Sequence, residues 1–304
     1  AIHSHQGRII QTRSHESILR EAKKITALPN FKGYIHDVGG PTANFRHPSC
    51  AKQLEVGVCR DRQCLFPKPC PNLDADHSDY IELLQKVRAL PGIKKVFVRS
   101  GIRYDYLLAD KNDRFLDELC RYHVSGQLKV APEHVAEHAL ANMGKPGKEV
   151  YLKFMRAFNK KNKEIGLKQF LVPYFISSHP GCTLRDAVEL SEFLRDIGHQ
   201  PEQVQDFIPT PGSASTAMYY SGINPETGKK VFVARNPHDK AMQRALMQYK
   251  NPKNRQLVKE ALQKTNRGDL IGDNAGCLLK IAASYNPKAR HSKNTANPKM
   301  NKRR

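Results

Sequence analysis

The chain has 304 residues, of which 39% are hydrophobic, so it can form the core of one large globular domain or two ordinary ones. No stretch approaches the roughly 18 to 20 consecutive apolar residues that a membrane helix needs, and no apolar signal segment is visible, which favours a cytoplasmic protein without a membrane partner. The formal net charge of +21 would indicate a nucleic-acid partner only if it lay on a folded face.

Apolar runs and helical periodicity alternate along the chain, which predicts strands separated by helices. The predicted strands cover residues 33–38, 93–99, 127–131, 169–177 and 204–209. The predicted helices cover residues 14–28, 79–90, 113–122, 149–165 and 183–194, and Ser14 is the expected N-cap of the first. This alternation predicts an α/β fold with parallel strands and right-handed crossovers, either doubly wound or a barrel.

Small, charged or turn-forming residues follow every predicted strand, in clusters that begin at Asp37, Arg99, Pro132, Ser177 and Pro209. Polar strand ends that meet at one mouth are typical of a barrel, whereas a doubly wound sheet concentrates its ligand contacts at one switch point. The chain also opens with a helix that leads into a strand, so we expect one more strand upstream. The sequence therefore predicts an incomplete (β/α)6 TIM-like barrel that lacks its first strand.

Four of the seven cysteines, Cys50, Cys59, Cys64 and Cys70, lie in one Cys-rich loop, residues 45–74. Disulfides are disfavoured in a reducing cytoplasm, so thiolates gathered in a Pro-rich loop indicate a metal site. Four thiolates suit tetrahedral zinc or an iron–sulfur cluster, although the spacing matches neither a zinc ribbon nor a ferredoxin. Ordinary reduced cysteines are the alternative.

The positive charge is concentrated near the C-terminus, where nineteen Lys and Arg residues stand against four acidic ones between residues 229 and 304. Residues 1–227 are expected to form the partial barrel and residues 228–287 a helical C-terminal region. Residues 288–304 carry seven basic residues and no acidic one, which predicts a disordered basic tail. A solubilising extension and a non-specific attraction to RNA or ribosomes are the alternative roles of this tail.

Several motifs resemble the YgiQ family of radical S-adenosylmethionine proteins: HDVGGPTAN at residues 36–44, the Cys-rich loop, KVAPEH at 129–134 and YFISSHPG at 174–181. The likeness covers nearly the whole chain. It implies a radical SAM barrel in which a Cys-x-x-x-Cys-x-x-Cys motif after the first strand holds a [4Fe–4S] cluster chelated by S-adenosylmethionine. That motif is absent from these 304 residues. In the family it directly precedes sequence like residues 1–8, so we expect the cluster ligands in an upstream part, for example a separately encoded N-terminal part of the same protein.

The resemblance also implies ligand contacts at the first strand ends. Gly39, Gly40 and Pro41 correspond to the glycine-rich turn where backbone groups meet the amino group of S-adenosylmethionine, although a tight turn would need glycine equally. Ser100 and Arg103 would face the ribose hydroxyls or the carboxylate, because an Arg fork matches a carboxylate. A solvated turn is the alternative for this pair.

Further along the chain, the resemblance places Glu133 near the methionyl group of S-adenosylmethionine. A buried carboxylate there needs a cation or hydrogen-bond donors, and capping of a helix is the alternative role. His134 and His179 are candidate proton donors at the same mouth, with a structural role as the alternative. Tyr219 and Tyr220 are expected to close the barrel or to line a substrate channel.

The implied activity is reductive cleavage of S-adenosylmethionine by the [4Fe–4S] cluster, which gives a 5′-deoxyadenosyl radical that abstracts hydrogen from a substrate. The substrate is not identified by the sequence or by the family, since one barrel supports many reactions. The alternative is a non-catalytic fragment that acts as an RNA-associated scaffold through its basic tail. The predicted barrel has no basic stripe with interleaved aromatic residues and no RNA-reading motif, which favours the enzyme.

Overall fold

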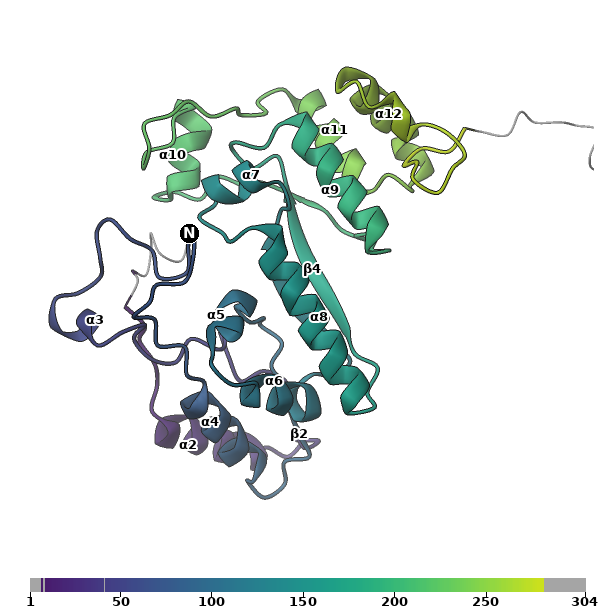
Figure 1. Ribbon diagram of the computed structural model, residues 1–304. Coiled ribbons are helices and arrows are strands. Elements are labelled where there is room, and N and C mark those ends of the chain that lie inside the picture. Colours follow the sequence, from purple (N-terminus) through teal and green to yellow (C-terminus); the bar gives the residue numbers. More distant parts are fainter. Residues whose placement is uncertain (1–6, 8, 41, 282–304) are drawn as a thin grey trace, which may run out of the picture.

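The computed structural model describes residues 7, 9–40 and 42–281 as a mixed α/β protein with parallel strands (Figure 1). In this part of the chain, β1 (Tyr34–Ile35) pairs with β2 (Lys95–Val96), and β4 (Phe170–Ser177) lies between β3 (Gln127–Glu133) and β5 (Gln205–Asp206). The five predicted strands and their parallel direction are therefore confirmed. β1, β2 and β5 are shorter than predicted, with two residues each.

The strands of the described residues do not close into a barrel. β2 and β3 are neighbours all the same, because a Cβ atom on Gly101, shortly after β2, would lie 3.4 Å from the carbonyl oxygen of Lys129 in β3. The segment after β2 therefore passes close to β3, although the described strands form two separate sheets. An incomplete barrel completed by an upstream strand stays a prediction.

Helices and strands alternate through the first half of the chain, as the sequence predicts. The helices there are α2 (His15–Thr26), α3 (Lys52–Glu55), α4 (Ser78–Arg88), α5 (Tyr104–Ala109), α6 (Arg114–Glu118) and the π-helical turn η1 (Leu119–His123). The Ser14 side chain caps α2 by accepting from the Ser17 N–H at 3.2 Å, which confirms that prediction.

The helix predicted over residues 113–122 is divided into α6 and η1. The wider π-helical turn brings His123 into the core, where its Nδ1 atom lies 2.8 Å from the Val96 carbonyl oxygen. Its Nε2 atom lies 3.1 Å from the carboxylate of Glu118. The division therefore allows a polar side chain to be buried with both ring nitrogens paired.

In the described part of the chain, six further α-helices and two short turns follow β3. They are α7 (Glu137–Asn142), α8 (Lys148–Glu164), α9 (Leu184–Asp196), α10 (Ala214–Ser221), α11 (Pro237–Met247) and α12 (Arg255–Lys264), with 3-10 turns η2 (Pro252–Asn254) and η3 (Gly268–Leu270). The sequence does not predict α3, α5, α7 or α10, because helices of four to eight residues are too short to show a clear apolar period.

The main hydrophobic core lies between one face of the strands and the helices that cover it, and α8 runs beside β4 in Figure 1. Val96, Leu128 and Val130 point into this core, together with the α8 residue Phe154. Alternate strand residues point the other way and are exposed, including Tyr34, Phe170 and Tyr174. One face of the strands is therefore covered by helices, whereas apolar side chains on the other face are exposed.

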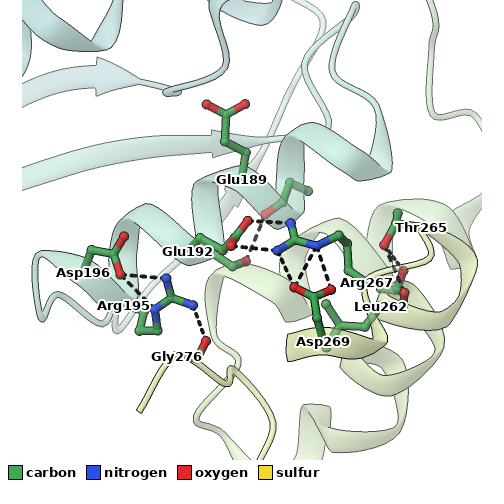
Figure 2. A network of polar contacts seen from close by, with 12 residues as sticks. Glu189, Glu192, Arg195, Asp196, Leu262, Thr265, Arg267, Asp269 and Gly276 are labelled. Carbon is green, nitrogen blue, oxygen red and sulfur yellow. Dashed lines mark hydrogen bonds and ion pairs between the residues drawn. The ribbon is translucent and has the colours of Figure 1, made fainter. Parts of the chain in front are cut away.

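A second core attaches the C-terminal helices to α9. Its buried residues include Val188, Met242, Leu246, Val258 and Leu262. Beside this core, the Arg267 guanidinium donates two hydrogen bonds to Glu192 of α9, at 2.7 and 2.9 Å, and is also paired with Asp269 (Figure 2). The predicted helical C-terminal region therefore packs on the α/β part through both apolar and charged contacts.

Two further predictions concern membranes and the basic tail. Across the described ranges, every helix is too short or too polar to cross a membrane. The predicted disordered tail, residues 288–304, lies outside the described residues, as does Pro41 of the glycine-rich turn.

Candidate functional site

Two residues at the carboxyl ends of neighbouring strands adopt a backbone conformation that side chains rarely tolerate. Glu133 ends β3 with φ of 69°, and Ser178 directly follows β4 with φ of 60°. Non-glycine residues in the left-handed region are uncommon, and such conformations often occur at ligand sites. Two of the five polar strand ends predicted from the sequence are therefore strained.

The turn after β1 is held by contacts within the chain. Asp37 Oδ1 accepts from the backbone N–H groups of Arg99 and Ser100 at 2.8 and 3.2 Å. A Cβ atom on Gly39 would lie 2.6 Å from the Ser100 Oγ atom, so packing alone requires glycine there. A Cβ atom on Gly40 would meet nothing within 4 Å, which leaves open space at this position.

The guanidinium of Arg103 binds a carboxylate of the protein itself, so two of its nitrogens already have a partner. Its Nε and NH2 atoms donate to the two carboxylate oxygens of Asp105, both at 2.7 Å. Its backbone N–H donates to Asn44 Oδ1 at 2.8 Å, and its carbonyl oxygen accepts from Asn44 Nδ2 at 3.1 Å. The predicted contact of Arg103 with a ligand carboxylate therefore stays a prediction that depends on its remaining nitrogen.

Glu133 has the cationic partner that its location requires. Lys145 Nζ donates to Glu133 Oε1 at 3.1 Å and to the Ala131 carbonyl oxygen at 2.7 Å. Both side chains are about one-fifth exposed, at 19% for Glu133 and 21% for Lys145. Burial lowers the pKa of Lys145, whereas the charge of Glu133 acts in the opposite direction. Sequence reasoning missed Lys145, because it lies twelve residues from Glu133 in a turn between α7 and α8.

His134 lies directly after Glu133 and is almost fully buried. The Ala136 N–H donates to its Nδ1 atom at 3.0 Å, so the neutral ring carries its proton on Nε2, which lies 3.3 Å from the Cys182 Sγ atom. Burial, with smaller effects from His179 and His138, lowers the pKa of His134 to about 3. Burial also raises the pKa of the Cys182 thiol. The pair is therefore neutral near pH 7, which is unlike an activated thiolate–imidazolium pair.

His179 follows β4 in the same cluster of strand ends. Its Nδ1 atom donates to the Pro180 carbonyl oxygen at 2.8 Å, and its Nε2 atom lies 2.9 Å from the Ser215 Oγ atom. Burial lowers the pKa of His179 to about 4. A ring with both nitrogens paired and little tendency to protonate has the features of a structural histidine, so its role as a proton donor stays a prediction.

A glutamine of the C-terminal helices holds the loop after β4. Gln243 of α11 is buried, and its Oε1 atom accepts from the N–H of Ser178 at 3.1 Å. Its Nε2 atom donates to the Cys182 carbonyl oxygen at 3.2 Å. One side chain therefore braces the strained residue and the end of its loop. No sequence signal identifies this role, because the contact joins segments that are far apart in the chain.

The two tyrosines predicted at the mouth differ in their surroundings. The Tyr219 hydroxyl accepts from Lys240 Nζ at 3.0 Å, and its ring lies 5.8 Å from that of Phe207, which in turn contacts His179. Tyr220 is 67% exposed. Tyr219 is therefore part of the packing around the β4 loop, whereas Tyr220 is free to contact a ligand or a partner.

The Cys-rich loop is closed at its base by contacts between its two ends. The Asp74 N–H donates to the Ser49 carbonyl oxygen at 2.7 Å, and His47 Nε2 lies 2.7 Å from the Asp76 carbonyl oxygen. Deeper in the protein, Asn44 Nδ2 lies 3.1 Å from His77 Nε2. These contacts hold the two ends together, and Leu65 within the loop packs in a small apolar cluster with Ala75 and Tyr106.

The four cysteines of this loop are not gathered into one ligand set. Among the described residues, no group of three or more His, Cys, Asp or Glu side chains is arranged to hold a metal ion. Instead, three of the sulfurs face donors: Lys52 Nζ lies 3.7 Å from Cys59, Gln53 Nε2 lies 3.8 Å from Cys64, and Arg62 NH1 lies 3.8 Å from Cys70. A metal bound by all four thiolates stays a prediction, and it requires this loop to close around the ion.

Protein purified without oxygen is expected to carry about one zinc ion or one iron–sulfur cluster in the Cys-rich loop, because metal ligation supplies the order that such a loop lacks. The Cys64→Ala variant should lose most of this metal, as measured by elemental analysis. Cys277→Ala, outside the loop, is the matched control and should retain it. Anaerobic preparations without metal would instead support four reduced cysteines.

The fold and the strand ends define an α/β protein with a polar site at the carboxyl ends of parallel strands. Residues 202–303 match the family model described as "Domain of unknown function (DUF3362)", so the chain has a DUF3362 domain. Its homologues are named UPF0313 proteins, which are the YgiQ family. The resemblance to the YgiQ family that the motifs indicate is therefore confirmed by the names of the homologues.

Three relatives illustrate the extent of the likeness. A UPF0313 protein of Clostridium perfringens strain 13 is 54% identical over 99% of this chain and 46% of its own length. A second, from Clostridium perfringens ATCC 13124, is 55% identical over 96% of this chain and 44% of its own length. A third, from Clostridium botulinum strain 657, is 57% identical over 92% of this chain and 44% of its own length. The chain thus spans less than half the length of the curated relatives it matches.

Proposed function

We propose that this chain is the part of a radical SAM enzyme of the YgiQ type that binds the amino-acid end of S-adenosylmethionine at the carboxyl ends of β1 to β4. The observation that carries the proposal is the Glu133–Lys145 pair, at 3.1 Å, at the strained end of β3. The likeness to UPF0313 proteins supports the choice of family. The substrate of the whole enzyme is not identified by these residues.

The chemistry of this pair suits a zwitterion. The amino-acid end of S-adenosylmethionine carries an ammonium and a carboxylate, which are the complements of the Glu133 carboxylate and the Lys145 ammonium. Charge-assisted hydrogen bonds of this kind are roughly twice as strong as neutral ones. Each group is about one-fifth exposed, so a ligand can reach it, and the partial burial strengthens the attraction. Gly40, with open space beside its Cα atom, leaves room for the ligand near β1.

The residues of this chain suit the amino-acid end of S-adenosylmethionine better than they suit the [4Fe–4S] cluster. The cluster would supply the electron that cleaves S-adenosylmethionine, and the family holds it with a Cys-x-x-x-Cys-x-x-Cys motif that this sequence lacks. The described residues contain no alternative group of ligands. We therefore assign the cluster ligands to a part outside this chain, and we assign binding and orientation of the ligand to this chain.

Isothermal titration calorimetry with S-adenosylmethionine tests the binding role. Glu133→Gln and Lys145→Met are each expected to weaken binding by about tenfold or more, because each removes a charged hydrogen-bond partner. Glu226→Gln is the control, since it removes an exposed carboxylate that has no ion pair among the described residues, and it should bind normally. Unchanged affinity in the Glu133 and Lys145 variants would contradict the proposal.

Lys145→Met also leaves Glu133 without its partner, which is expected to reduce the free energy of unfolding by about 2 kcal/mol, given the partial exposure of the pair. The double variant Glu133→Gln/Lys145→Met removes both charges and should recover much of this loss. Because it still cannot bind the zwitterion, a stable double variant without affinity separates the loss of binding from unfolding. Thermal melting measured beside calorimetry provides both readings.

A further inference from the structure

A second cavity lies on the C-terminal helices, well separated in the chain from the strand ends. It has a volume of about 440 Å³ and is bordered by α12 and the segment that follows η3, in the yellow part of Figure 1. Leu279 is buried and Ile271 half-buried, and they form its apolar lining together with Ile281, which is 56% exposed. We call this cavity the α12 groove.

Three cations surround the α12 groove: Lys253, Arg255 and Lys259. None of them has an ion pair with a carboxylate in the described part of the chain, and α12 has no acidic residue in its first turn. The next acidic residue on α12, Glu260, is already paired with His238 and Lys264. The charge around the groove is therefore not neutralised by the protein itself, which raises the local potential for anions.

The guanidinium of Arg255 is held in place. Its NH2 atom donates to the Lys280 carbonyl oxygen at 2.6 Å, which anchors one edge of the planar group beside the cavity. An anchored guanidinium can stack against a base with its face while its free N–H groups contact phosphate. The groove therefore combines a fixed planar cation, two flexible lysines and an apolar lining.

We propose that the α12 groove binds single-stranded RNA, with one nucleotide in the cavity and the flanking phosphates on Lys253, Arg255 and Lys259. The cavity falls within the range of roughly 300 to 1,000 Å³ that small organic groups occupy, which suits a ribose and a base. Single-stranded RNA offers splayed bases together with closely spaced phosphates, which is the combination that this groove complements. An anionic membrane is a poorer match, because insertion needs several projecting apolar side chains, whereas Leu279 is buried, Ile271 is half-buried and Ile281 alone of the three is exposed.

The binding site is distinct from the proposed S-adenosylmethionine site and does not depend on it. It lies within residues 202–303, which match the DUF3362 family model. This inference therefore assigns a ligand class to that part of the chain.

Fluorescence anisotropy of the full chain with a labelled oligouridylate of about twelve nucleotides, over a series of KCl concentrations, tests the proposal. Lys253→Gln/Lys259→Gln is expected to weaken binding about tenfold or more at low salt. It should also reduce the slope of log K against log salt by about 1.4, since each phosphate contact to a single strand contributes about 0.7. Lys23→Gln/Lys24→Gln on α2 removes the same charge from exposed residues elsewhere and should change affinity less than about twofold.

A further variant separates the cavity from simple charge attraction. Ile281→Ser removes an exposed apolar contact and should weaken binding about threefold while the salt slope stays unchanged. Lys253→Arg/Lys259→Arg keeps the charges and should bind like the unchanged chain, which guards against a folding defect in the Gln variant. Equal losses in the α12 and α2 variants would overturn the proposal, as would an unchanged affinity in the α12 variant. Binding of the α12 groove to phosphatidylserine vesicles but not to RNA would also overturn it.

Discussion

Incubated with iron, sulfide and a reductant under anaerobic conditions, this chain is expected to leave S-adenosylmethionine intact. An extended chain that carries an upstream Cys-x-x-x-Cys-x-x-Cys motif, as the resemblance to the YgiQ family implies, is expected to release 5′-deoxyadenosine. The physical reason is that cleavage needs an electron from a [4Fe–4S] cluster that the family holds with a Cys-x-x-x-Cys-x-x-Cys motif, and this sequence lacks that motif. Chromatography should detect no 5′-deoxyadenosine from the present chain and should detect it from the extended chain.

Two controls make this expectation specific. Replacing the three motif cysteines of the extended chain with Ala should abolish the product, whereas Glu133→Gln should lower it by at least about tenfold through weaker binding. Product from the present chain alone would mean that a cluster assembles on its own cysteines. In that event, loss of the product in the Cys64→Ala variant would locate the cluster in the Cys-rich loop.

The second expectation is a marked loss of stability in mild acid. Burial lowers the pKa of His134 to about 3 and that of His179 to about 4, whereas both return to about 6.5 in the unfolded chain. Between pH 6.5 and 4 the unfolded chain therefore binds more protons than the folded one, so the free energy of unfolding falls as the pH falls. Linkage gives a loss on the order of 2 kcal/mol for each histidine between pH 7 and pH 5.

Urea unfolding at pH 7 and pH 5 measures this loss. His134→Gln and His179→Gln should each flatten the pH dependence, because glutamine retains a donor and an acceptor but does not titrate. His238→Gln makes the same substitution at an exposed histidine of α11 and is the matched control for the substitution itself. A free energy of unfolding that is equal at the two pH values would show that these rings are not held neutral.

The sequence predicts the parallel strands because short apolar runs bounded by turn residues alternate with helical patterns along the chain. It also predicts that polar residues gather at the strand ends, since parallel strands all end at the same edge. Glu133 and His134 belong to one of these clusters, whereas a ligand role for Glu133 is implied by the family resemblance. Short helices such as α5 and α10 were missed, because their boundaries depend on tertiary contacts rather than on a local period.

The partners of the strand-end residues could not be predicted. Lys145 approaches Glu133 only because the turn between α7 and α8 returns to the end of β3, and nothing in its local sequence marks a buried amine. Asp105, the partner of Arg103, lies only two residues away. The sequence alone does not show whether Arg103 pairs with this carboxylate or with the carboxylate of a ligand. The shape of the Cys-rich loop was also out of reach, since thiol spacing alone does not determine how an irregular loop folds.

The brace formed by Gln243 has a consequence for the order of events during protein synthesis. Ser178 and Gln243 are 65 residues apart, so α11 is made only after β4 and the loop that follows it. Until then, the amide of Ser178 and the carbonyl of Cys182 lack the partner that holds them in the folded protein. Chains grow from the N-terminus and their early parts fold first. The loop beside the candidate site is therefore one of the last features to mature, and a ribosome that stalls before α11 releases a chain with strands but without a finished site.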